Sequence, residues 1–423
     1  MAESRTHVVM LPWCAFGHLI PFFHLSISLA KSGVHVSFIS TPRNIQRLPK
    51  PPSTLAHLLD LVELPLPSLD AGLLPEGAEA TVDIPSDKEF QVKLQFFSVI
   101  TASVQVFFGP PGARGALPSP KDLTVPPEWI TFPSSVAYQM HEAIAIFDGA
   151  YQENVSGLSD IERFNKVFGA SQAVLFRSCH EIEGEYLNLY QELIGKPVIP
   201  IGLLPPDKPE RRMVDESWCK TFEWLDAQAT KSVVFVGFGS ECKLSKDQVF
   251  EIAYGLELSE LPFLWILRKP TWAIHDHESL PLGFVERTSK RGKVCMGWAP
   301  QQEILAHPSI GVSFFHSGWG SVIENLQFGN TLVVLPFIVD QPLTARFLVE
   351  KGLAIEVKRN NEDGSFSRDD IAKSLREAMV MEEGEKLRNK TRDAANVVGD
   401  LKLHQDYMAE FVKFLKTGIW KQI

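Results

Sequence analysis

The residues whose types and spacing most suggest chemistry lie between 298 and 341. Residues 311–315 form an apolar run that predicts a buried strand, and this strand delivers His316 at its end. Two glycines follow, and a helix is expected to begin near Ser321. The free N–H groups and positive dipole of such a helix, with His316 and the Ser321 hydroxyl as further donors, predict an anion-binding site.

Three further features of this segment suit a nucleotide sugar. Glu324 lies three residues after Ser321, on the same helical face, where its carboxylate can accept protons from two sugar hydroxyls. Trp298 offers a flat face for a base, and Asp340 with Gln341 forms a carboxylate and amide pair. Each residue alone is explained as readily by packing or solvation. Their occurrence along one strand, helix and strand unit favours a joint function.

Residues 298–341 resemble the 44-residue signature of plant family 1 UDP-dependent glycosyltransferases. The positions that match are Trp298, Gln301, His307, His316, Gly318, Trp319, Ser321, Glu324, Pro336, Asp340 and Gln341. The resemblance implies a GT-B fold of two doubly wound, Rossmann-like α/β domains that face a cleft. It also implies that a UDP-sugar is the co-substrate, with no further cofactor and no metal.

The resemblance implies a role for each matching residue. Trp298 would stack on uracil, Gln301 would lie near the base and ribose, and Glu324 would bind the ribose hydroxyls. His316 and Ser321 would face the diphosphate. Hydroxyls of the donor sugar would be held by the pair at 340 and 341. The full donor-binding set implied is Ser240, Trp298, Ala299, Gln301, His316, Gly318, Trp319, Gly320, Ser321, Glu324, Asp340 and Gln341.

Two positions of this set refine the expectation. Gly320 stands where many family members carry an asparagine that touches phosphate, so that contact would fall to backbone N–H groups and Ser321. Gln341 resembles the residue of glucose-using members and favours UDP-glucose, while UDP-rhamnose or a pentose donor stays open.

His18 is the predicted catalytic base. It lies in the motif Pro-Trp-x-Ala-Phe-Gly-His-x-x-Pro of residues 12–21, which resembles the same family. A neutral imidazole with an ordinary pKa of about 6.5 suits a general base at neutral pH. A histidine in the turn after a first strand is more often structural, and the family pattern gives His18 this role. This variant of the motif resembles the branch that adds a sugar to an existing glycoside.

The family pattern breaks near residues 88–96. About one βαβ unit, roughly 30 residues or more, is missing between residue 80 and Phe96. The missing part should contain the aspartate that orients the catalytic histidine. Neither Asp83 nor Asp87 sits at the end of a recognisable strand, so neither is assigned that role. Loss of the orienting carboxylate predicts a poor catalyst that still binds its donor.

The elements that must position these residues follow the rhythm of parallel sheets. Strands are expected at 7–13 and 34–40 around a helix at 21–31, and later at 233–238, 263–267, 294–297, 311–315, 331–335 and 353–357. Ser245 is expected to cap a helix, and Ser367, three residues before Asp370, is expected to cap a later one. Five prolines between 196 and 212 mark a linker. We therefore expect an acceptor-binding domain at 1–205, a UDP-sugar-binding domain at 206–400, and a last helix at 401–423 that packs back on the first domain.

Composition narrows the class of partner. The 423 residues carry a net charge of −10 and no basic run, which disfavours nucleic acid. No apolar stretch reaches the ~20 residues of a membrane helix, and the N-terminus lacks a signal-peptide pattern. The five cysteines show none of the paired spacings of zinc sites or redox motifs, and their odd number argues against a disulfide framework, which fits a reducing compartment. These features predict a cytoplasmic protein. The cluster at 275–278 has metal-ligand residue types but reads as a solvated polar loop.

The sequence therefore predicts inverting transfer of a sugar, most simply glucose, from a UDP-sugar to a hydroxyl of a small acceptor such as a glycosylated flavonoid or terpenoid. One alternative is a UDP-sugar-binding protein with impaired catalysis. The other is an NAD(P)-dependent oxidoreductase, suggested by Gly-x-Gly pairs at 237–239 and 318–320, both of which lack the third glycine of a dinucleotide fingerprint.

Overall fold

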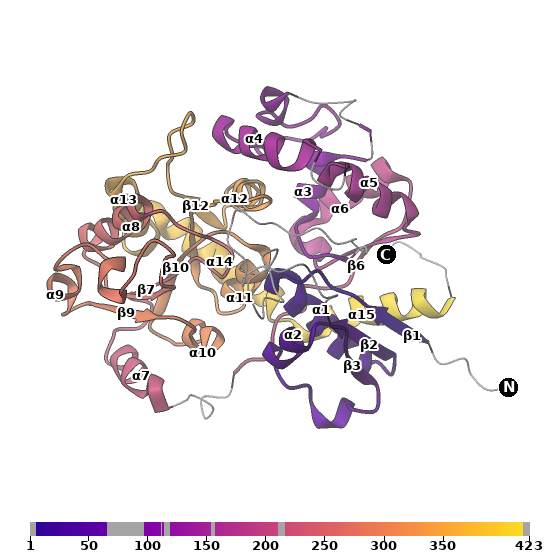
Figure 1. Cartoon of the computed structure of the whole chain (residues 1–423), viewed down its shortest axis with the longest axis horizontal. Helices are drawn as coiled ribbons and strands as arrows, with labels where there is room; N and C mark the ends of the chain where they lie inside the picture. Colours follow the sequence, from indigo (N-terminus) through magenta and orange to yellow (C-terminus); the bar gives the residue numbers. More distant parts are fainter. Residues whose placement is uncertain are drawn as a thin grey trace. The chain divides into compact units, whose positions relative to one another are not determined.

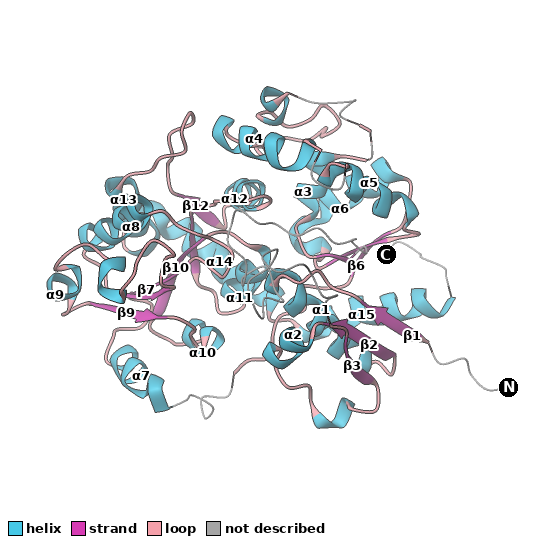
Figure 2. Ribbon diagram, in the orientation of Figure 1, coloured by secondary structure: helices cyan, strands magenta, loops and turns pink. Residues whose placement is uncertain are grey.

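The computed structural model describes residues 6–65, 97–110, 112–113, 119–153, 157–209 and 216–417. The chain divides into two compact units. The first contains residues 1–117, 147–204 and 400–423, and the second contains residues 118–146 and 205–399. Both are α/β units with parallel strands, which Figures 1 and 2 show in sequence colours and by element type.

The second unit is built on a six-stranded parallel sheet of order β12-β11-β10-β7-β8-β9. Its strands are β7 (Val233–Gly237), β8 (Phe263–Leu267), β9 (Gly292–Met296), β10 (Ile310–Phe315), β11 (Thr331–Val334) and β12 (Ala354–Glu356). Chain order reverses between β7 and β10, which pair directly, with Phe315 opposite Gly237. The sheet is therefore doubly wound, with its topological switch point between these two strands.

Alternate side chains of the strands enter two separate cores. Val234 and Val236 of β7 pack with apolar side chains of α8, α9 and α13, whereas Val233 and Phe235 pack with those of α7 and α10. A sheet covered on both faces explains the continuous apolar runs at these strands. The strands expected between residues 233 and 357 agree with β7 to β12 to within two residues at each end.

The helices and short turns of the second unit precede, connect or follow these strands along the chain (Figure 1). They are η3 (Pro120–Leu123), α4 (Met140–Ile146), η6 (Glu216–Trp218), α7 (Cys219–Asp226), α8 (Lys246–Ser259), η7 (Asp276–Ser279), α9 (Phe284–Thr288), α10 (Gln301–Leu305), α11 (Trp319–Leu326), α12 (Gln341–Glu350), α13 (Arg368–Met379), η8 (Glu382–Gly384) and α14 (Glu385–Val398).

The start of α8 and that of α13 are set by hydroxyl caps. Ser245 accepts a hydrogen bond from the Gln248 N–H at 3.3 Å, and Ser367 accepts one from the Asp370 N–H at 3.2 Å. A side-chain oxygen satisfies an N–H group that the first helical turn leaves without an intrahelical acceptor. Both caps were expected from the sequence.

The first unit contains two three-stranded parallel sheets, β1-β2-β3 and β4-β5-β6. The strands are β1 (His7–Met10), β2 (His35–Ser40), β3 (Leu59–Glu63), β4 (Phe97–Ser98), β5 (Val174–Phe176) and β6 (Val198–Pro200). The helical elements are α1 (Phe16–Lys31), α2 (Pro42–Arg47), η1 (Ser53–Leu55), α3 (Ala102–Phe108), η4 (Phe147–Tyr151), α5 (Asp160–Ala170), α6 (His180–Ile194) and α15 (Leu401–Thr417).

The two sheets of the first unit share one hydrophobic core. Phe22 of α1 meets Phe97 of β4 edge to face, with ring centroids 5.0 Å apart, and Phe411 of α15 is buried in the same cluster. Within the described residues β1 pairs only with β2, and Val9 on β1 is 52% exposed. The first strand of a doubly wound sheet is normally central and buried, so this β1 has the character of an edge strand. The predicted gap at 88–96, with Asp83 and Asp87, lies outside the described residues.

Two local expectations differ from the structure. Helix α1 begins at Phe16 rather than at Pro21, because the Ala15 carbonyl accepts from the N–H groups of His18 and Leu19 at 2.9 and 2.8 Å. His18 therefore lies in the first turn of the helix. The expected linker also contains β6, since Val198 and Pro200 pair with β5.

Residues 118–146 belong to the second unit, although the sequence analysis placed them within 1–205. The reason is a buried ion pair: Arg346 of α12 donates to both carboxylate oxygens of Glu142, at 3.1 and 3.0 Å. Ser135 and Tyr138 add hydrogen bonds to Glu350 and Val339. The last helix, α15, groups with the first unit, where Tyr407 donates to the Glu181 carboxylate.

Among the described residues, no helix is both long and apolar enough to cross a membrane.

The packed core of the second unit predicts the effect of a cavity. Phe314 on β10 is fully buried, so Phe314→Ala should lower the free energy of unfolding by about 3–5 kcal/mol. Leu282→Ala serves as the control, because Leu282 is 99% exposed and its truncation should change stability by less than about 0.5 kcal/mol. Urea unfolding of the intact chain, followed by tryptophan fluorescence, measures the free energy of unfolding of each variant. Equal stabilities would contradict the assigned burial.

Candidate functional site

Several of the predicted donor-binding residues follow the carboxyl ends of sheet strands in the second unit. Ser240 follows β7, Trp298 follows β9, His316 follows β10, and residues 336–341 follow β11. In open parallel sheets, ligands bind outside the carboxyl ends of the strands at the switch point. The switch point here lies between β7 and β10, so the loops at 238–241 and 316–318 lie side by side.

His316 is held tightly between these two loops. A Cβ atom added at Gly239 would lie 2.8 Å from its Cε1 atom, and one added at Gly318 would lie 2.7 Å from its Nε2 atom. Gly239 also has a φ of +72°, which glycine adopts without strain. The two glycines therefore let the imidazole pack directly against backbone.

The surroundings of His316 keep its ring neutral. Burial lowers the pKa of His316 to about 4 because the charged form loses its hydration. Its Nδ1 atom is buried and has no hydrogen-bond partner among the described residues. A buried ring nitrogen without a partner is costly unless a ligand supplies one. This arrangement suits an anion whose oxygen receives a hydrogen bond from His316.

Helix α11 begins beside this histidine. Gly318 is its N-cap and offers no side-chain cap, so first-turn N–H groups remain for a ligand. Ser321 lies in this first turn, and Gly320 leaves the backbone accessible. The indole of Trp319 is only 2% exposed and packs edge to face on Phe347, so Trp319 can meet a ligand through its backbone alone.

Glu324 and Gln301 are joined directly. The Gln301 Nε2 atom donates to the Glu324 carboxylate at 2.7 Å. Both side chains are half-buried, one on α11 and the other at the start of α10. The remaining lone pairs of Glu324 can accept from a vicinal pair of hydroxyls, which is the recognition that a ribose requires.

Trp298 is the most exposed of the predicted residues, with 68% of its surface accessible. The Arg268 guanidinium carbon lies 4.1 Å from the centroid of its ring. A cation over one face of an indole is attracted by the ring's quadrupole and fixes its plane. Ala299, the next residue, is partly buried against the core that contains α7 and α10.

The loop at 336–341 holds the predicted sugar-binding pair. Burial raises the pKa of Asp340 to about 6, because its charged form is poorly solvated. The Gln341 Oε1 atom accepts from the N–H groups of Phe337 and Ile338, at 3.0 and 3.1 Å. Because the amide oxygen of Gln341 is used in this way, its Nε2 group is the part of the side chain that could donate to a ligand. The Cys242 sulfur lies 3.9 Å from this Nε2 atom.

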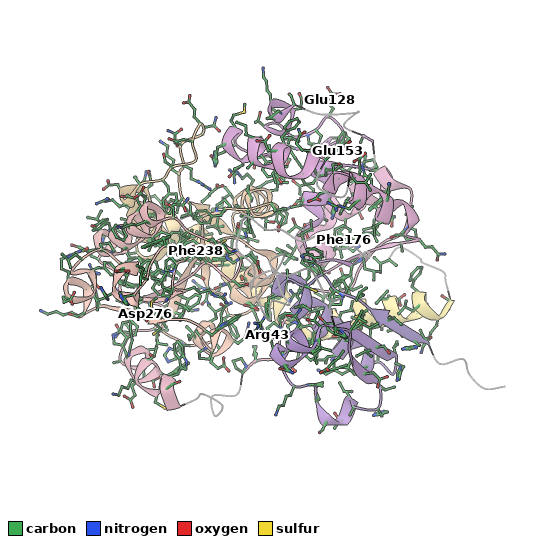
Figure 3. The ribbon with its side chains drawn as sticks, in the orientation of Figure 1. Arg43, Glu128, Glu153, Phe176, Phe238 and Asp276 are labelled. Atoms are coloured by element: carbon green, nitrogen blue, oxygen red, sulfur yellow. The ribbon has the colours of Figure 1, made fainter. Side chains whose placement is uncertain are left out.

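An aromatic cluster supports these loops from below. Phe238, labelled in Figure 3, meets Phe314 and Phe337 edge to face, with centroids 5.2 and 5.7 Å apart. Ser240, two residues later, donates to Glu241 at 3.3 Å. These ring contacts pack the ends of β7 and β10 against the loop after β11.

His18, the predicted base, lies in the first turn of α1 in the first unit. Burial lowers the pKa of His18 to about 4, so its imidazole is neutral at physiological pH. Within the described part of the chain, no carboxylate is hydrogen-bonded to its ring. The ring of His18 therefore has the protonation state that a general base requires. Among the described residues, no carboxylate orients it.

Two residues of the second-unit site were missed by the sequence analysis. Arg268 directly follows β8, so its position at a strand's carboxyl end was the available indication. Ser317 carries no such indication: it adopts a φ of +64°, is fully buried, and donates to the Gln341 carbonyl at 2.8 Å. This bond ties the loop after β10 to the loop after β11.

The polar cluster at 275–278 has a structural role. Glu278 accepts from the N–H groups of Ile274 and His275 at 2.8 and 3.0 Å, which caps η7, the turn that contains Asp276 (Figure 3). Among the described residues no group of three or more histidine, cysteine or acidic side chains is placed to hold a metal ion.

Comparison with known proteins identifies the family. Residues 212–388 match the family model for UDP-glucoronosyl and UDP-glucosyl transferases. UDP-glycosyltransferase 91A1 of Arabidopsis thaliana is 38% identical over an alignment that covers 98% of this chain and 97% of that protein. The chain belongs to the UDP-glycosyltransferase family. As a member, it is an enzyme that transfers sugar from a UDP-sugar to a small-molecule acceptor.

A further relative and two solved structures support the same family and fold. Soyasaponin III rhamnosyltransferase of Glycine max is 38% identical, with 98% of this chain and 96% of that protein covered. The structure of the UDP-glycosyltransferase UGT73P12 of Glycyrrhiza uralensis, complexed with glycyrrhetinic acid 3-O-monoglucuronide, has a TM-score of 0.75 at 22% identity and covers 98% of this chain and 96% of its own. The structure of TcCGT1 with UDP has a TM-score of 0.72 at the same identity, covering 98% of this chain and 100% of its own. The GT-B fold of the UDP-glycosyltransferases is thereby confirmed.

The bond between Gln301 and Glu324 gives a direct test of the donor site. If Glu324 holds the ribose hydroxyls, Glu324→Ala should weaken UDP binding by about 1.5–3 kcal/mol, since a charged acceptor is lost. Glu286→Ala removes the same charge from an exposed position on α9 and should leave the affinity unchanged. Isothermal titration calorimetry with UDP distinguishes the two. Unchanged affinity in the Glu324 variant would remove Glu324 from the site.

Proposed function

We propose that this UDP-glycosyltransferase transfers glucose from UDP-glucose, with inversion, to a hydroxyl group of a glycosylated terpenoid or flavonoid. The observation that carries the proposal is the line of donor-type residues along one sheet edge. Trp298 follows β9, His316 follows β10, and Asp340 lies in the loop after β11, all at the carboxyl edge of the one sheet. The Nδ1 atom of His316 has no partner among the described residues, and Glu324 lies on α11, the helix that begins three residues after His316.

In the proposed reaction His18 acts as the general base. Its neutral imidazole takes the proton of the acceptor hydroxyl while the oxygen attacks the anomeric carbon of the sugar. The bond between that carbon and the diphosphate oxygen breaks as the new bond forms, so the anomeric configuration inverts. The proton ends on His18, and the bonding electron pair leaves with UDP.

The leaving diphosphate would be stabilised by donors of the second unit. The N-terminus of α11 supplies N–H groups and a positive dipole, and His316 and Ser321 add side-chain donors. These groups are preorganised, because Gly239 and Gly318 hold the imidazole in place before a ligand arrives. We therefore propose that no metal ion is required.

The donor sugar would be selected by Asp340 and Gln341. Asp340 offers a carboxylate acceptor, while Gln341 offers an amide donor whose oxygen is already used by the loop. A glucose with a full set of equatorial hydroxyls can satisfy both groups. Because one relative is named a rhamnosyltransferase, UDP-rhamnose is the alternative donor to compare.

The acceptor class rests on the names of similar proteins. Soyasaponin III rhamnosyltransferase and mogroside IIIx synthase of Siraitia grosvenorii, the second 33% identical, are named for glycosides. The motif around His18 supports the same class. We propose that the acceptor already carries a sugar.

A second candidate is a UDP-sugar-binding protein with impaired transfer. Among the described residues, the strands of the first unit form two separate sheets and β1 pairs with β2 alone, and both features favour this candidate. The alignment with the Arabidopsis relative spans 461 positions; 98% of 423 residues is about 415, so about 46 positions of the alignment have no counterpart in this chain. Loss of an orienting carboxylate beside a histidine base can lower the rate by up to about 10⁴-fold.

The transfer assay tests the proposal. The full chain is incubated with UDP-glucose, UDP-rhamnose or UDP-xylose and glycyrrhetinic acid 3-O-monoglucuronide in EDTA, and products are measured by mass spectrometry. We expect a glucosylated product at a slow rate, lost in His18→Ala. Turnover of the usual magnitude, ~1–10³ per second, would eliminate the impaired candidate. Binding of UDP without any product would favour it, and binding of NAD(P) in place of UDP would overturn both.

The pH dependence of transfer tests the state of His18. A base acts when unprotonated, and the pKa of His18 is lowered to about 4 by burial. The value of kcat/KM for the acceptor should therefore stay constant as pH falls through 6.5 and decline only below about pH 5. Saturating UDP-glucose keeps the titration of Asp340, whose pKa is raised to about 6, out of this profile. An acid limb centred near 6.5 would mean that His18 is solvated.

A further inference from the structure

The loop at 336–341 contains a strained residue next to the proposed sugar-binding pair. Val339 adopts a φ of +46°, and this left-handed conformation is unfavourable for a β-branched residue. Its side chain is 62% exposed, so packing of the isopropyl group does not hold the conformation in place. A strained residue persists only where surrounding contacts over-determine it.

One such contact comes from a segment far away in sequence. The Tyr138 hydroxyl donates to the Val339 carbonyl at 2.8 Å. Tyr138 is only 2% exposed, so its hydroxyl acts in a poorly solvated environment where a hydrogen bond is strong and a lost one is costly. The bond fixes the peptide that leads directly into Asp340.

Tyr138 is itself held firmly within the second unit. Its N–H group donates to the Leu123 carbonyl at 3.0 Å. Segment 135–142, which contains Tyr138, also contacts α12 at two points. Glu142 pairs with Arg346, and the Ser135 N–H donates to Glu350 at 2.8 Å. Segment 135–142 therefore contacts α12 in its middle and at its C-terminal end, and contacts the loop directly before its N-terminus.

Other residues fix the remaining peptides of the loop. Arg359 donates to the Pro336 carbonyl, Gln341 accepts from the N–H groups at 337 and 338, and Ser317 donates to the Gln341 carbonyl. Val339 lies between these anchors. Within the described residues, the hydrogen bond from Tyr138 is the side-chain contact that fixes the Val339 carbonyl.

We propose that Tyr138 is a positioning residue for donor-sugar recognition. By holding the Val339 carbonyl, it sets the direction of the following peptide and hence the placement of the Asp340 carboxylate and the Gln341 amide. This inference rests on the proposed function, in which that pair binds the sugar of the donor. Tyr138 is not among the residues proposed to bind uracil, ribose or diphosphate, which are Trp298, Glu324 and His316 respectively.

The variant Tyr138→Phe tests this role, because it removes the hydroxyl and keeps the buried ring. We expect an unchanged affinity for UDP. We expect a three- to tenfold weaker affinity and higher KM for UDP-glucose, as for the loss of one neutral hydrogen bond in the loop. Calorimetry with UDP and with UDP-glucose on the full chain measures the two separately. Tyr190→Phe is the control, since it removes a buried hydroxyl that contacts Gln105 in the first unit.

The outcomes separate this inference from the proposed function. If the unmodified chain binds UDP-glucose no differently from UDP and transfers no glucose, the proposed function fails. If it distinguishes the two ligands and Tyr138→Phe distinguishes them equally well, the role of Tyr138 is overturned. Equal weakening of both ligands, or loss of UDP binding altogether, would mark Tyr138 as merely structural and would also overturn it.

Discussion

The candidate site of the second unit depends on the pairing of β10 with β7 at the switch point of its sheet. That pairing brings the end of the first strand of the unit beside the end of the fourth, so that Gly239 and Gly318 close on His316 from two sides. The same edge receives Trp298 from β9 and residues 336–341 from β11, and the helix α11 opens from it.

The loops at this edge are fixed by bonds between them rather than by their own sequence preferences. Two residues without favourable left-handed geometry, Ser317 and Val339, adopt positive φ angles there. Each is compensated by a hydrogen bond that crosses between segments, from Ser317 to Gln341 and from Tyr138 to Val339. The apolar floor of Phe238, Phe314 and Phe337 makes these bonds possible by holding their strands rigidly. Strain is thereby concentrated where the sugar is proposed to bind.

The sequence predicted the second unit well, because its apolar runs and hydroxyl caps are local. Strand positions, the caps at Ser245 and Ser367, and the order of the site residues all follow from patterns within about ten residues. Contacts across long separations were not predictable in this way. The pairing of Arg268 with Trp298, and of Glu142 with Arg346, depends on how the sheet brings distant segments together. For the same reason residues 118–146 were placed with the wrong neighbours: nothing local indicates that Glu142 has its partner 204 residues later.

Burial opposes charge on two titratable side chains of the candidate site. It lowers the pKa of His316 to about 4 and raises that of Asp340 to about 6, so both shifts oppose charge in the absence of ligand. The imidazole is therefore uncharged at neutral pH and can donate through one nitrogen only. A diphosphate placed at the N-terminus of α11 would bring negative charge close to this ring, and a nearby negative charge raises the pKa of a histidine. In the proposed reaction the charge on the diphosphate would grow as the sugar leaves, and the interaction with His316 would strengthen with it. Under that proposal, a neutral histidine beside Gly239 and Gly318 would stabilise the leaving group more than the resting donor.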